Sequence, residues 1–289
     1  MKIVKLLGGL GNQMFQYAFY RSLQNKGIKV YADLSDFDEY PLHNGYELER
    51  VFNLSVKTPG KFLLNLFRPN QSKWIFRKLK RILNLKNTYK VEENEFTFDS
   101  SFFNNTNKYY SGYWQNQEYF HHIEDQIKHD FKFPEITGIE NQTILQQIVN
   151  TESVAIHVRR GDYLKDSLLG GICNLHYYEQ AILSINSRIK DAEFFIFSDD
   201  IAWCKRNLNL KKATYIDWNK GSSSYIDMQL MSNCKHNIIA NSSFSWWGAW
   251  LNPDNDKVVI APQNWFGKKT DYFDDRDIVP ESWIRVPNE

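Results

Sequence analysis

The feature that most constrains this fold is a regular alternation of short apolar strands and helical segments between residues 153 and 262. Segments such as SVAIHV, EFFIFSD and HNIIAN are mainly apolar over the length of one strand, and amphipathic helical patterns separate them. Strands that alternate with such helices form parallel sheets, because each helix provides the crossover to the next strand. The second half of the chain is therefore predicted to be a doubly wound α/β domain.

The N-terminal residues show one further unit in which a strand, a helix and a second strand follow one another. An apolar strand, a glycine-rich turn, a helix from about Asn12 to Asn25 and a second strand ending at Asp33 form a βαβ unit. Residues 35–110 are less regular and rich in aromatic and turn residues, so the strand and helix pattern leaves their structure open. A polar stretch that ends near residue 153 marks the boundary between two predicted domains, at 1–150 and 151–289.

Composition narrows the functional class. The chain has 289 residues, a formal charge of +1 and three widely spaced cysteines. The near-neutral charge gives no argument for nucleic acid as a partner, and the few cysteines favour reduced thiols in a cytoplasm-like compartment over a disulfide framework or a zinc site. The apolar run before Gly8 is too short for a signal peptide, and no run approaches the roughly 20 apolar residues of a membrane span. A soluble or peripheral cytoplasmic protein is therefore expected.

The loop GGLGNQ follows the first strand, and ligands of open α/β sheets bind at the carboxyl ends of strands. A dinucleotide fingerprint requires a third glycine where this chain has Met14, although Asp33 lies near the distance of the acidic residue that would follow. Gly9 permits a close backbone approach, and Asn12 and Gln13 lie at a helix N-terminus, which favours anions. The alternative is a tight turn that serves packing alone.

The segment AIHVRRGDYL places two arginines directly after a strand that is expected to be buried on both faces. His157 lies near the end of that strand, and Arg159, Arg160 and Asp162 lie in the loop. A guanidinium matches phosphate oxygens and does not lose its charge, so the pair suits a diphosphate. The alternative is a structural cluster in which Asp162 pairs with one arginine and the other meets solvent.

Two further loops follow apolar strands. FSDD carries Ser198 and Asp199, and NSSF begins a helix after the strand HNIIAN. The polar residues of NSSF either cap that helix or present hydroxyl and backbone N–H groups to an anion. Asp227 lies in a helical pattern, where an exposed carboxylate is the ordinary interpretation. The candidate residues of NSSF are Asn241, Ser242, Ser243 and Phe244.

Taken together, these motifs resemble those of a known family. GGLGNQMFQYA, HVRRGDY and NSSFSWWGAWL, with FSDD and DMQLMSNC between them, are similar to the motifs of the bacterial and animal α-1,2-fucosyltransferases, glycosyltransferase family 11. The resemblance covers most of the chain, and residues 35–110 are its least specific part. It implies a GT-B type α/β fold in which two Rossmann-like domains face a cleft, with an acceptor-side domain at 1–150 and a GDP-fucose-binding domain at 151–289.

The resemblance also implies an inverting transfer of L-fucose from GDP-fucose to O2 of a galactose unit, in glycan or polysaccharide biosynthesis, without a required metal. Arg159 would hold the diphosphate, Arg160 would support it, and His157 would lie near the guanosine. Asp227 would accept the N–H edge of guanine. The other implied donor-site residues are Gly9, Asn12, Gln13, Ser198, Asp199, Asn241, Ser242, Ser243 and Phe244.

Two charges change during such a transfer. Negative charge grows on the β-phosphate as the fucose C1–O bond breaks, and Arg159 is the residue expected to stabilise it. The acceptor hydroxyl loses a proton, for which Asp162 is the motif carboxylate closest in sequence. Departing GDP, acting through a water molecule, is the alternative base.

Four other functions are weighed against this one. An NAD-dependent oxidoreductase shares the βαβ opening but requires the missing glycine. A metal-dependent glycosyltransferase requires D-x-D, and three unrelated matches, at 36–38, 254–256 and 275–277, show how common that pattern is. A non-catalytic sugar-binding module rests on Trp246 and Trp247, which follow a buried strand and are expected to pack. A fucosyltransferase of another linkage stays open, because the motifs do not name the acceptor.

The segment from Lys61 to Lys90 contains nine Lys or Arg residues and no acidic residue. An apolar stripe at helical spacing, with basic residues opposite, indicates an amphipathic helix. This helix either packs on the acceptor domain or rests on an anionic membrane, which would place the enzyme on its inner face near a lipid-linked acceptor. The stripe consists of Ile75, Phe76, Leu79, Ile82 and Leu83.

Overall fold

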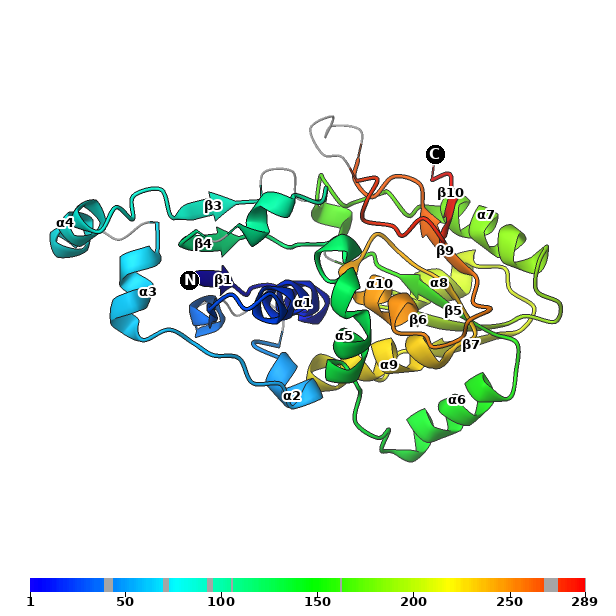
Figure 1. Cartoon of the computed structure of the whole chain (residues 1–289). Helices are drawn as coiled ribbons and strands as arrows, with labels where there is room; N and C mark the ends of the chain where they lie inside the picture. The colour runs from blue at the N-terminus through cyan, green and yellow to red at the C-terminus, as the bar shows by residue number, and fades with distance from the viewer. Residues whose placement is uncertain are drawn as a thin grey trace. The chain divides into compact units, whose positions relative to one another are not determined.

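The computed structural model of the chain describes residues 1–38, 44–69, 73–92, 96–104, 106–161, 163–267 and 275–288. The chain divides into two compact units, Met1–Lys132 and Phe133–Glu289. Each unit is built on one parallel sheet covered by helices (Figure 1). The predicted α/β architecture, with a parallel sheet in each half of the chain, is confirmed.

The sheet of the first unit has the strand order β2-β1-β4-β3, and every pair of neighbours is parallel. Its strands are β1 (Lys2–Lys5), β2 (Val30–Asp33), β3 (Tyr89–Val91) and β4 (Lys108–Ser111). Helix α1 (Leu10–Asn25) is the crossover from β1 to β2, as the sequence predicts. The shorter helices are α2 (Leu48–Phe52), α3 (Lys61–Phe67), α4 (Trp74–Ile82), α5 (Glu124–Asp130), and the 3₁₀ helices η1 (Ser35–Asp38), η2 (Ser100–Phe103), η3 (Gln117–Tyr119) and η4 (His121–Ile123).

Aromatic residues fill the core of the first unit around α1. Phe19 on this helix is fully buried and stacks on Trp114, with ring centroids 4.2 Å apart and an interplanar angle of 20°. Phe102 meets Trp114 edge to face at 4.7 Å, and Tyr119 does so at 5.7 Å. Packing therefore explains part of the chain's high aromatic content, because offset and edge-to-face ring pairs fill a core with few voids.

The sheet of the second unit has the order β10-β9-β8-β5-β6-β7, again with all neighbours parallel. Read from β7, this is the order 3-2-1-4-5-6 of the doubly wound dinucleotide-binding fold, and the order reverses between β5 and β8. Its strands are β5 (Ser153–Val158), β6 (Glu193–Ser198), β7 (Ala213–Ile216), β8 (His236–Ile238), β9 (Val259–Pro262) and β10 (Ile284–Val286).

Helices cover both faces of this sheet (Figure 1). Helices α7 (Leu175–Asn186) and α8 (Ile201–Asn207) share one apolar cluster with alternate residues of β5 and β6. Helices α9 (Tyr225–Asn233) and α10 (Ser243–Trp250) pack on each other, and α6 (Ile139–Val149) packs on α9. The structure therefore divides the chain before α6, between Lys132 and Phe133. The sequence places the boundary after this helix, between residues 150 and 151. Two 3₁₀ turns, η5 (Tyr163–Lys165) and η6 (Gly221–Ser223), complete the unit.

No helix in the described part of the chain is long enough and apolar enough to span a membrane.

Candidate functional site

Three loops of the second unit meet where β5, β6 and β8 end. Because the strands are parallel, the residues after Val158, Ser198 and Ile238 emerge at one edge of the sheet. Since the strand order reverses between β5 and β8, helices leave this edge on opposite faces and open a crevice between the loops. This edge is the candidate site that the strand pattern and the polar loops predict.

Arg159 is held by the loop after β6. Its Nη1 lies 3.1 Å from Oδ2 of Asp199, and the two side chains are 32% and 24% exposed. The other carboxylate oxygen of Asp199 accepts the backbone N–H of Arg160 at 2.9 Å. One carboxylate therefore fixes both the guanidinium and the loop that carries it.

Arg160 is held differently. Its Nε lies 3.4 Å from Oδ2 of Asp200, and its guanidinium carbon lies 4.2 Å from the centroid of the Trp203 ring on α8. A guanidinium on an indole face gains cation–π attraction and loses rotational freedom. Oδ1 of Asp200 also accepts the N–H of Trp203 at 3.0 Å and so caps α8. Arg159 and Arg160 thus form ion pairs with Asp199 and Asp200. Asp162, which the sequence alternative pairs with an arginine, lies outside the described residues.

Gly161 makes room for this arrangement. A Cβ atom on Gly161 would lie 2.8 Å from Oδ2 of Asp199, which is the oxygen paired with Arg159. That separation is shorter than a normal carbon–oxygen contact, so a side chain at this position must displace the carboxylate.

Replacing Gly161 by alanine is therefore expected to release Arg159 from its position. If Arg159 has the role that the motif resemblance implies, kcat/KM should fall by at least about tenfold, because misplacing a group that stabilises the transition state is costly, while less than about 1 kcal/mol is lost in the free energy of unfolding. Steady-state kinetics and urea unfolding measure the two quantities. Gly171→Ala is not a suitable control, because Gly171 has φ +75° and is strained by any side chain; Gly60→Ala, which meets no atom within 4 Å, is the matched control.

A cavity of about 270 Å³ lies next to the arginines. Tyr163 borders it, with its ring 5.5 Å from the Arg159 guanidinium and its hydroxyl donating to the carbonyl of Asn241 at 3.4 Å. Residues of the loop after β5 and of the loop after β8 thus line the same cavity. Its other lining residues include Arg160, Cys173, Asn174, Trp203 and Asn207.

His157 is buried near the end of β5, directly beneath the arginines. Burial, with the nearby charge of Arg159, lowers its pKa to about 3, so the ring is neutral at physiological pH. Its ring centroid lies 5.8 Å from that of Phe244 on α10, and its Nδ1 has no hydrogen-bond partner within the residues that the structure describes. Because buried polar atoms are almost always paired, this atom is a candidate contact for a bound ligand or water.

The NSSF loop connects β8 to α10. The Asn241 side chain donates to the carbonyls of Leu169, at 3.2 Å, and Trp265, at 3.0 Å. Asn241 therefore braces the loop from within and is 2% exposed. Ser242 is the residue before the helix, but its hydroxyl does not cap it, so this hydroxyl is available to other partners. Ser243 and Phe244 are half-buried at the start of α10.

The tryptophans of α10 are packing residues, as the sequence analysis expects. Trp246 and Trp247 are fully buried and meet edge to face with centroids 5.0 Å apart. Nε1 of Trp246 donates to the carbonyl of Ile278 at 2.7 Å. A sugar stacks on exposed rings, and these rings are not exposed.

Asp227 belongs to a separate polar network at the start of α9. Its Oδ1 accepts from Nδ2 of Asn219 at 2.8 Å, and Asn219 exchanges hydrogen bonds with Asn141 of α6 at 2.9 and 3.0 Å. Nε1 of Trp218 also donates to Asn141 at 2.9 Å. Burial raises the pKa of Asp227 from 3.8 to about 7 although the Asn219 contact lowers it, so this carboxyl is not the ordinary exposed helical carboxylate.

The raised pKa of Asp227 predicts a pH dependence of stability. Between pH 3.8 and about 7 the folded state binds more protons at Asp227 than the unfolded state does, so stability falls as pH rises through this window. Asp227→Asn keeps the Asn219 contact without the charge. The free energy of unfolding of the variant, minus that of the native chain, should therefore rise between pH 4 and 7 and level off above; a difference that is flat or falls would contradict the raised pKa.

In the first unit, hydrogen bonds among its own residues hold the glycine-rich loop between β1 and α1. Gly8 has φ +82°, and the backbone N–H groups of Asn12 and Gln13 donate to the carbonyl of Gly9 at 3.0 and 3.1 Å. The Gln13 amide is fully buried, donates to the carbonyls of Gly8 and Gly45, and accepts from the N–H of Glu47. Gln13 therefore braces the loop with both ends of its amide, whereas Asn12 is only half-buried and contacts Gln115 at 2.8 Å.

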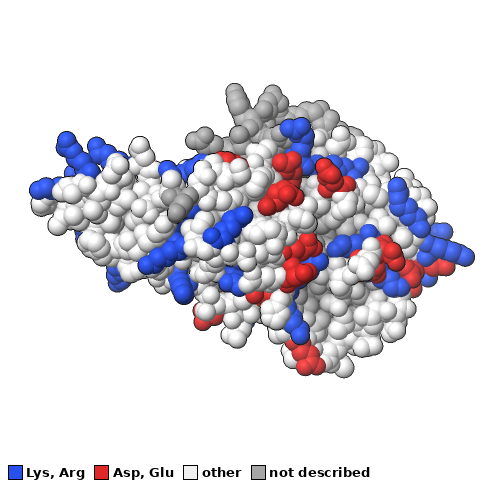
Figure 2. Space-filling model, viewed as in Figure 1, with Lys and Arg blue, Asp and Glu red and all other residues white. Residues whose placement is uncertain are grey.

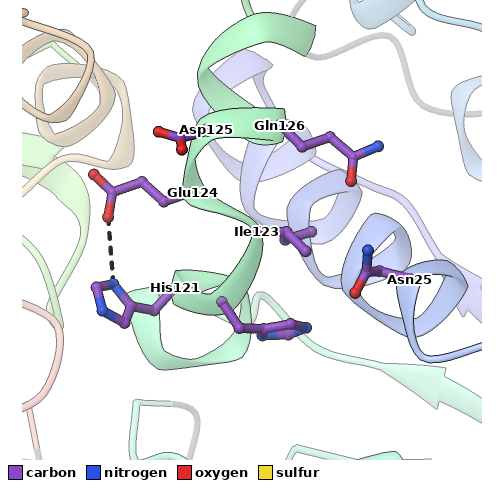
Figure 3. Close-up of a pocket in the computed structure, with 7 residues that line it drawn as sticks. Asn25, His121, Ile123, Glu124, Asp125 and Gln126 are labelled. Carbon is purple, nitrogen blue, oxygen red and sulfur yellow. Dashed lines mark ion pairs between the residues drawn. The ribbon is translucent and has the colours of Figure 1, made fainter.

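A larger cavity, of about 590 Å³, lies in the first unit between the end of α1 and η4 with α5 (Figure 3). Asn25, His121 and Glu124 line it, and Nδ1 of His121 lies 3.3 Å from Oε2 of Glu124. Helix α1 ends here on its way to the start of β2, so this cavity is at the amino edge of the sheet. Ligands of such sheets bind at the opposite edge.

No group of three or more His, Cys, Asp and Glu side chains among the described residues is arranged to hold a metal ion.

Comparison with known proteins identifies the family. The model of glycosyl transferase family 11 matches residues 1–286, nearly the whole chain. The chain belongs to this family. The resemblance that the motifs suggest is thereby confirmed, and the protein is a glycosyltransferase.

Two bacterial glycosyltransferases are similar to the chain over nearly their full length. An α-1,2-colitosyltransferase of Escherichia coli is 32% identical, over 98% of each chain, and the O-antigen biosynthesis glycosyltransferase WbnK of E. coli is 31% identical, over 97% of this chain and 99% of the relative. Galactoside α-(1,2)-fucosyltransferase 1 of Saimiri sciureus is 28% identical over 52% of this chain and 44% of the relative. Fucosyltransferase NodZ from Bradyrhizobium, a solved structure, aligns with 16% identity and a TM-score of 0.48 over 86% of this chain and 92% of that one.

Membership of family 11 sets aside two of the other functions considered, the NAD-dependent oxidoreductase and the non-catalytic sugar-binding module. The structure adds residues that the motifs do not single out. Trp203 and Asp200 hold Arg160, and Tyr163 lies beside Arg159. The only sequence signal for them is that β5 and β6 are neighbours, which places the two loops side by side.

Proposed function

We propose that this family 11 enzyme transfers L-fucose from GDP-fucose to O2 of a galactose unit, with inversion at the fucose carbon. The observation that carries the proposal is the pair of arginines at the carboxyl edge of the second unit, held in place by carboxylates and by an indole face. The names of the family 11 relatives, α-1,2-fucosyltransferase and α-1,2-colitosyltransferase, support the linkage.

The geometry suits a departing diphosphate. Arg159 is paired with Asp199 and its side chain is 32% exposed, so a phosphate can reach it at the edge of the sheet. As the bond between fucose C1 and the β-phosphate oxygen breaks, both electrons stay on the phosphate. A fixed guanidinium therefore stabilises the transition state more than the ground state.

The guanosine contacts form the next part of the proposal. His157 is neutral and presents an Nδ1 atom without a described partner, and the hydroxyls of Ser242 and Ser243 start α10 beside it. Asp227 would accept hydrogen bonds from the N–H edge of guanine. Burial raises the pKa of this carboxyl, and donation from guanine would favour its ionised form. Phe244, Ser198 and Asn241 would shape the pocket, and Gly9 and Asn12 would contact the donor from the first unit.

The acceptor hydroxyl forms the new C1–O2 bond and releases its proton. We assign Asp162 as the base, with transfer to departing GDP through water as the alternative. Asp162→Asn distinguishes them, because loss of a base lowers kcat by about 10²–10⁴-fold, whereas proton transfer to GDP leaves kcat nearly unchanged.

Metal independence is part of the proposal, since Arg159 and Arg160 supply the positive charge that a cation would bring. Activity should be the same in EDTA and in Mg²⁺ or Mn²⁺. A loss of more than about tenfold in EDTA that a divalent cation restores would contradict it.

The defining experiment is incubation with GDP-fucose and a panel of galactosides, with the product linkage read by NMR. We expect an α-1,2 linkage to galactose. A parallel reaction with GDP-colitose tests a second donor, which the 32% identical colitosyltransferase favours. Lipid-linked galactosides in the panel test our proposal that the acceptor is a membrane-borne glycan precursor met at the cytoplasmic face. Products with another linkage would contradict the reaction proposed.

A further inference from the structure

Helices α3 and α4 form one end of the first unit (Figure 1). Phe76 on α4 and Leu66 and Phe67 on α3 are buried in a small cluster with Ile3 and Tyr109 of the sheet. Leu79 packs against the same cluster. The inward residues of the predicted apolar stripe therefore pack in the core and hold α4 against the rest of the unit.

The outward face of α4 does not pack. Trp74 and Ile82 are each 67% exposed, and Ile75 is 49% exposed. Trp74, Lys78 and Ile82 follow one another at i, i+4 spacing and so share one face of the helix. Phe62 at the start of α3 is 62% exposed, with its ring 5.6 Å from that of Phe76. Large apolar side chains thus stand out from this end of the unit.

Basic residues surround this apolar face. Arg77, Lys78 and Arg81 on α4 are exposed, and no described acidic residue forms an ion pair with them. The segment 61–90 contains nine Lys or Arg and no acid. Figure 2 shows Lys and Arg side chains gathered at this end of the unit, without acidic ones on the face in view.

We propose that α3 and α4 form a docking surface for an anionic membrane, on which Trp74, Ile75 and Ile82 enter the interface and Arg77, Lys78 and Arg81 contact lipid phosphates. Helices that lie on membranes combine such an apolar face with Lys and Arg. Tryptophan favours the headgroup level because its ring is apolar and its N–H is polar. A nucleic acid would use the charges but not the exposed Trp74 and Ile82. The inference is independent of the donor and linkage proposed above.

Co-sedimentation of the full chain with vesicles tests the surface. We expect binding to equal mixtures of phosphatidylglycerol and phosphatidylcholine and little binding to phosphatidylcholine alone. The triple variant Arg77→Gln, Lys78→Gln, Arg81→Gln should lower the partition coefficient about a hundredfold, because each cation near an anionic surface contributes roughly a factor of five. The double variant Trp74→Ala, Ile82→Ala should lower it at least about tenfold, as expected from the lost apolar burial.

Two matched controls separate this face from general effects. Lys190→Gln, Lys211→Gln, Lys220→Gln removes three exposed charges of the second unit, and Ile139→Ala, Leu183→Ala removes two exposed apolar side chains there. Both should keep membrane binding within about threefold, as expected for surface changes away from the contact. Far-UV circular dichroism and transfer to a soluble galactoside verify that the α4 variants are folded and active, so a failure here is distinct from a failure of the proposed reaction.

Three results would overturn the inference. The first is equal binding of the native chain to anionic and neutral vesicles, or to neither. The second is a loss in the control triple as large as in the α4 triple. The third is a dimer in analytical ultracentrifugation that Trp74→Ala, Ile82→Ala dissociates while vesicle binding is unaffected, which would make the face a contact between two copies of the chain.

Discussion

Replacing Arg159 by alanine is expected to lower kcat/KM for GDP-fucose by about 10²–10³-fold, mainly through kcat. In the proposed mechanism the guanidinium meets charge that develops in the transition state, and removing one such group from an enzyme costs about this much. Asp199 would also lose its ion-pair partner and, in this mechanism, would keep its negative charge near the phosphates. Initial rates at varied donor concentration separate kcat from KM.

Two variants sharpen this test. Arg159→Lys keeps a positive charge without the planar fork and should retain part of the activity. Arg188→Ala removes an exposed arginine at the end of α7 that contacts only Ser184 and Ser187 in the described structure, and should leave kcat/KM unchanged. If Arg159→Ala stays within about tenfold of the native enzyme, roughly 1.4 kcal/mol of barrier, the electrostatic role is wrong.

Replacing Trp247 by alanine is expected to be the most destabilising of these changes. The side chain is fully buried and packs edge to face with Trp246, at 5.0 Å, and Trp250, at 5.2 Å. Truncating a buried aromatic residue leaves a cavity and costs about 3–5 kcal/mol of the free energy of unfolding. Urea unfolding followed by circular dichroism measures the loss, with the transition of the second unit analysed by itself because the two units need not unfold together.

The matched control for Trp247 is Trp74, which is 67% exposed on α4. Trp74→Ala should change the free energy of unfolding by less than about 0.5 kcal/mol, because surface substitutions away from special features have small effects. The comparison also decides what the tryptophans of α10 do. A Trp247→Ala variant that kept its stability and lost affinity for the acceptor would show a sugar-stacking role and contradict the packing account.

The fold of the second unit could be predicted from the sequence. Its apolar strands alternate with helices, and a helical crossover between neighbouring strands makes them parallel. The strands predicted at 153–158, 193–199 and 236–241 correspond to β5, β6 and β8. The site at their carboxyl ends was predictable for the same reason, because strand order in this fold places the loops together.

Other features depend on contacts that no local pattern reveals. The division between the units falls before α6 because this helix packs on α9, about eighty residues later in the chain. Gln13 has the position of a ligand contact in its motif, but its amide is used by the backbone of Gly8, Gly45 and Glu47. The stripe on α4 splits into a packed and an exposed half, and only the tertiary structure distinguishes Phe76 from Ile75.

The central claim is that Arg159 holds the diphosphate of a GDP-linked sugar, and isothermal titration calorimetry with GDP and GMP tests it most directly. The native enzyme should bind GDP about 10–100-fold more tightly than GMP, the range expected for hydrogen bonds between charged groups. Arg159→Ala should lose most of this preference while its affinity for GMP stays within about threefold. Undiminished preference for GDP in the variant would show that the β-phosphate is held elsewhere.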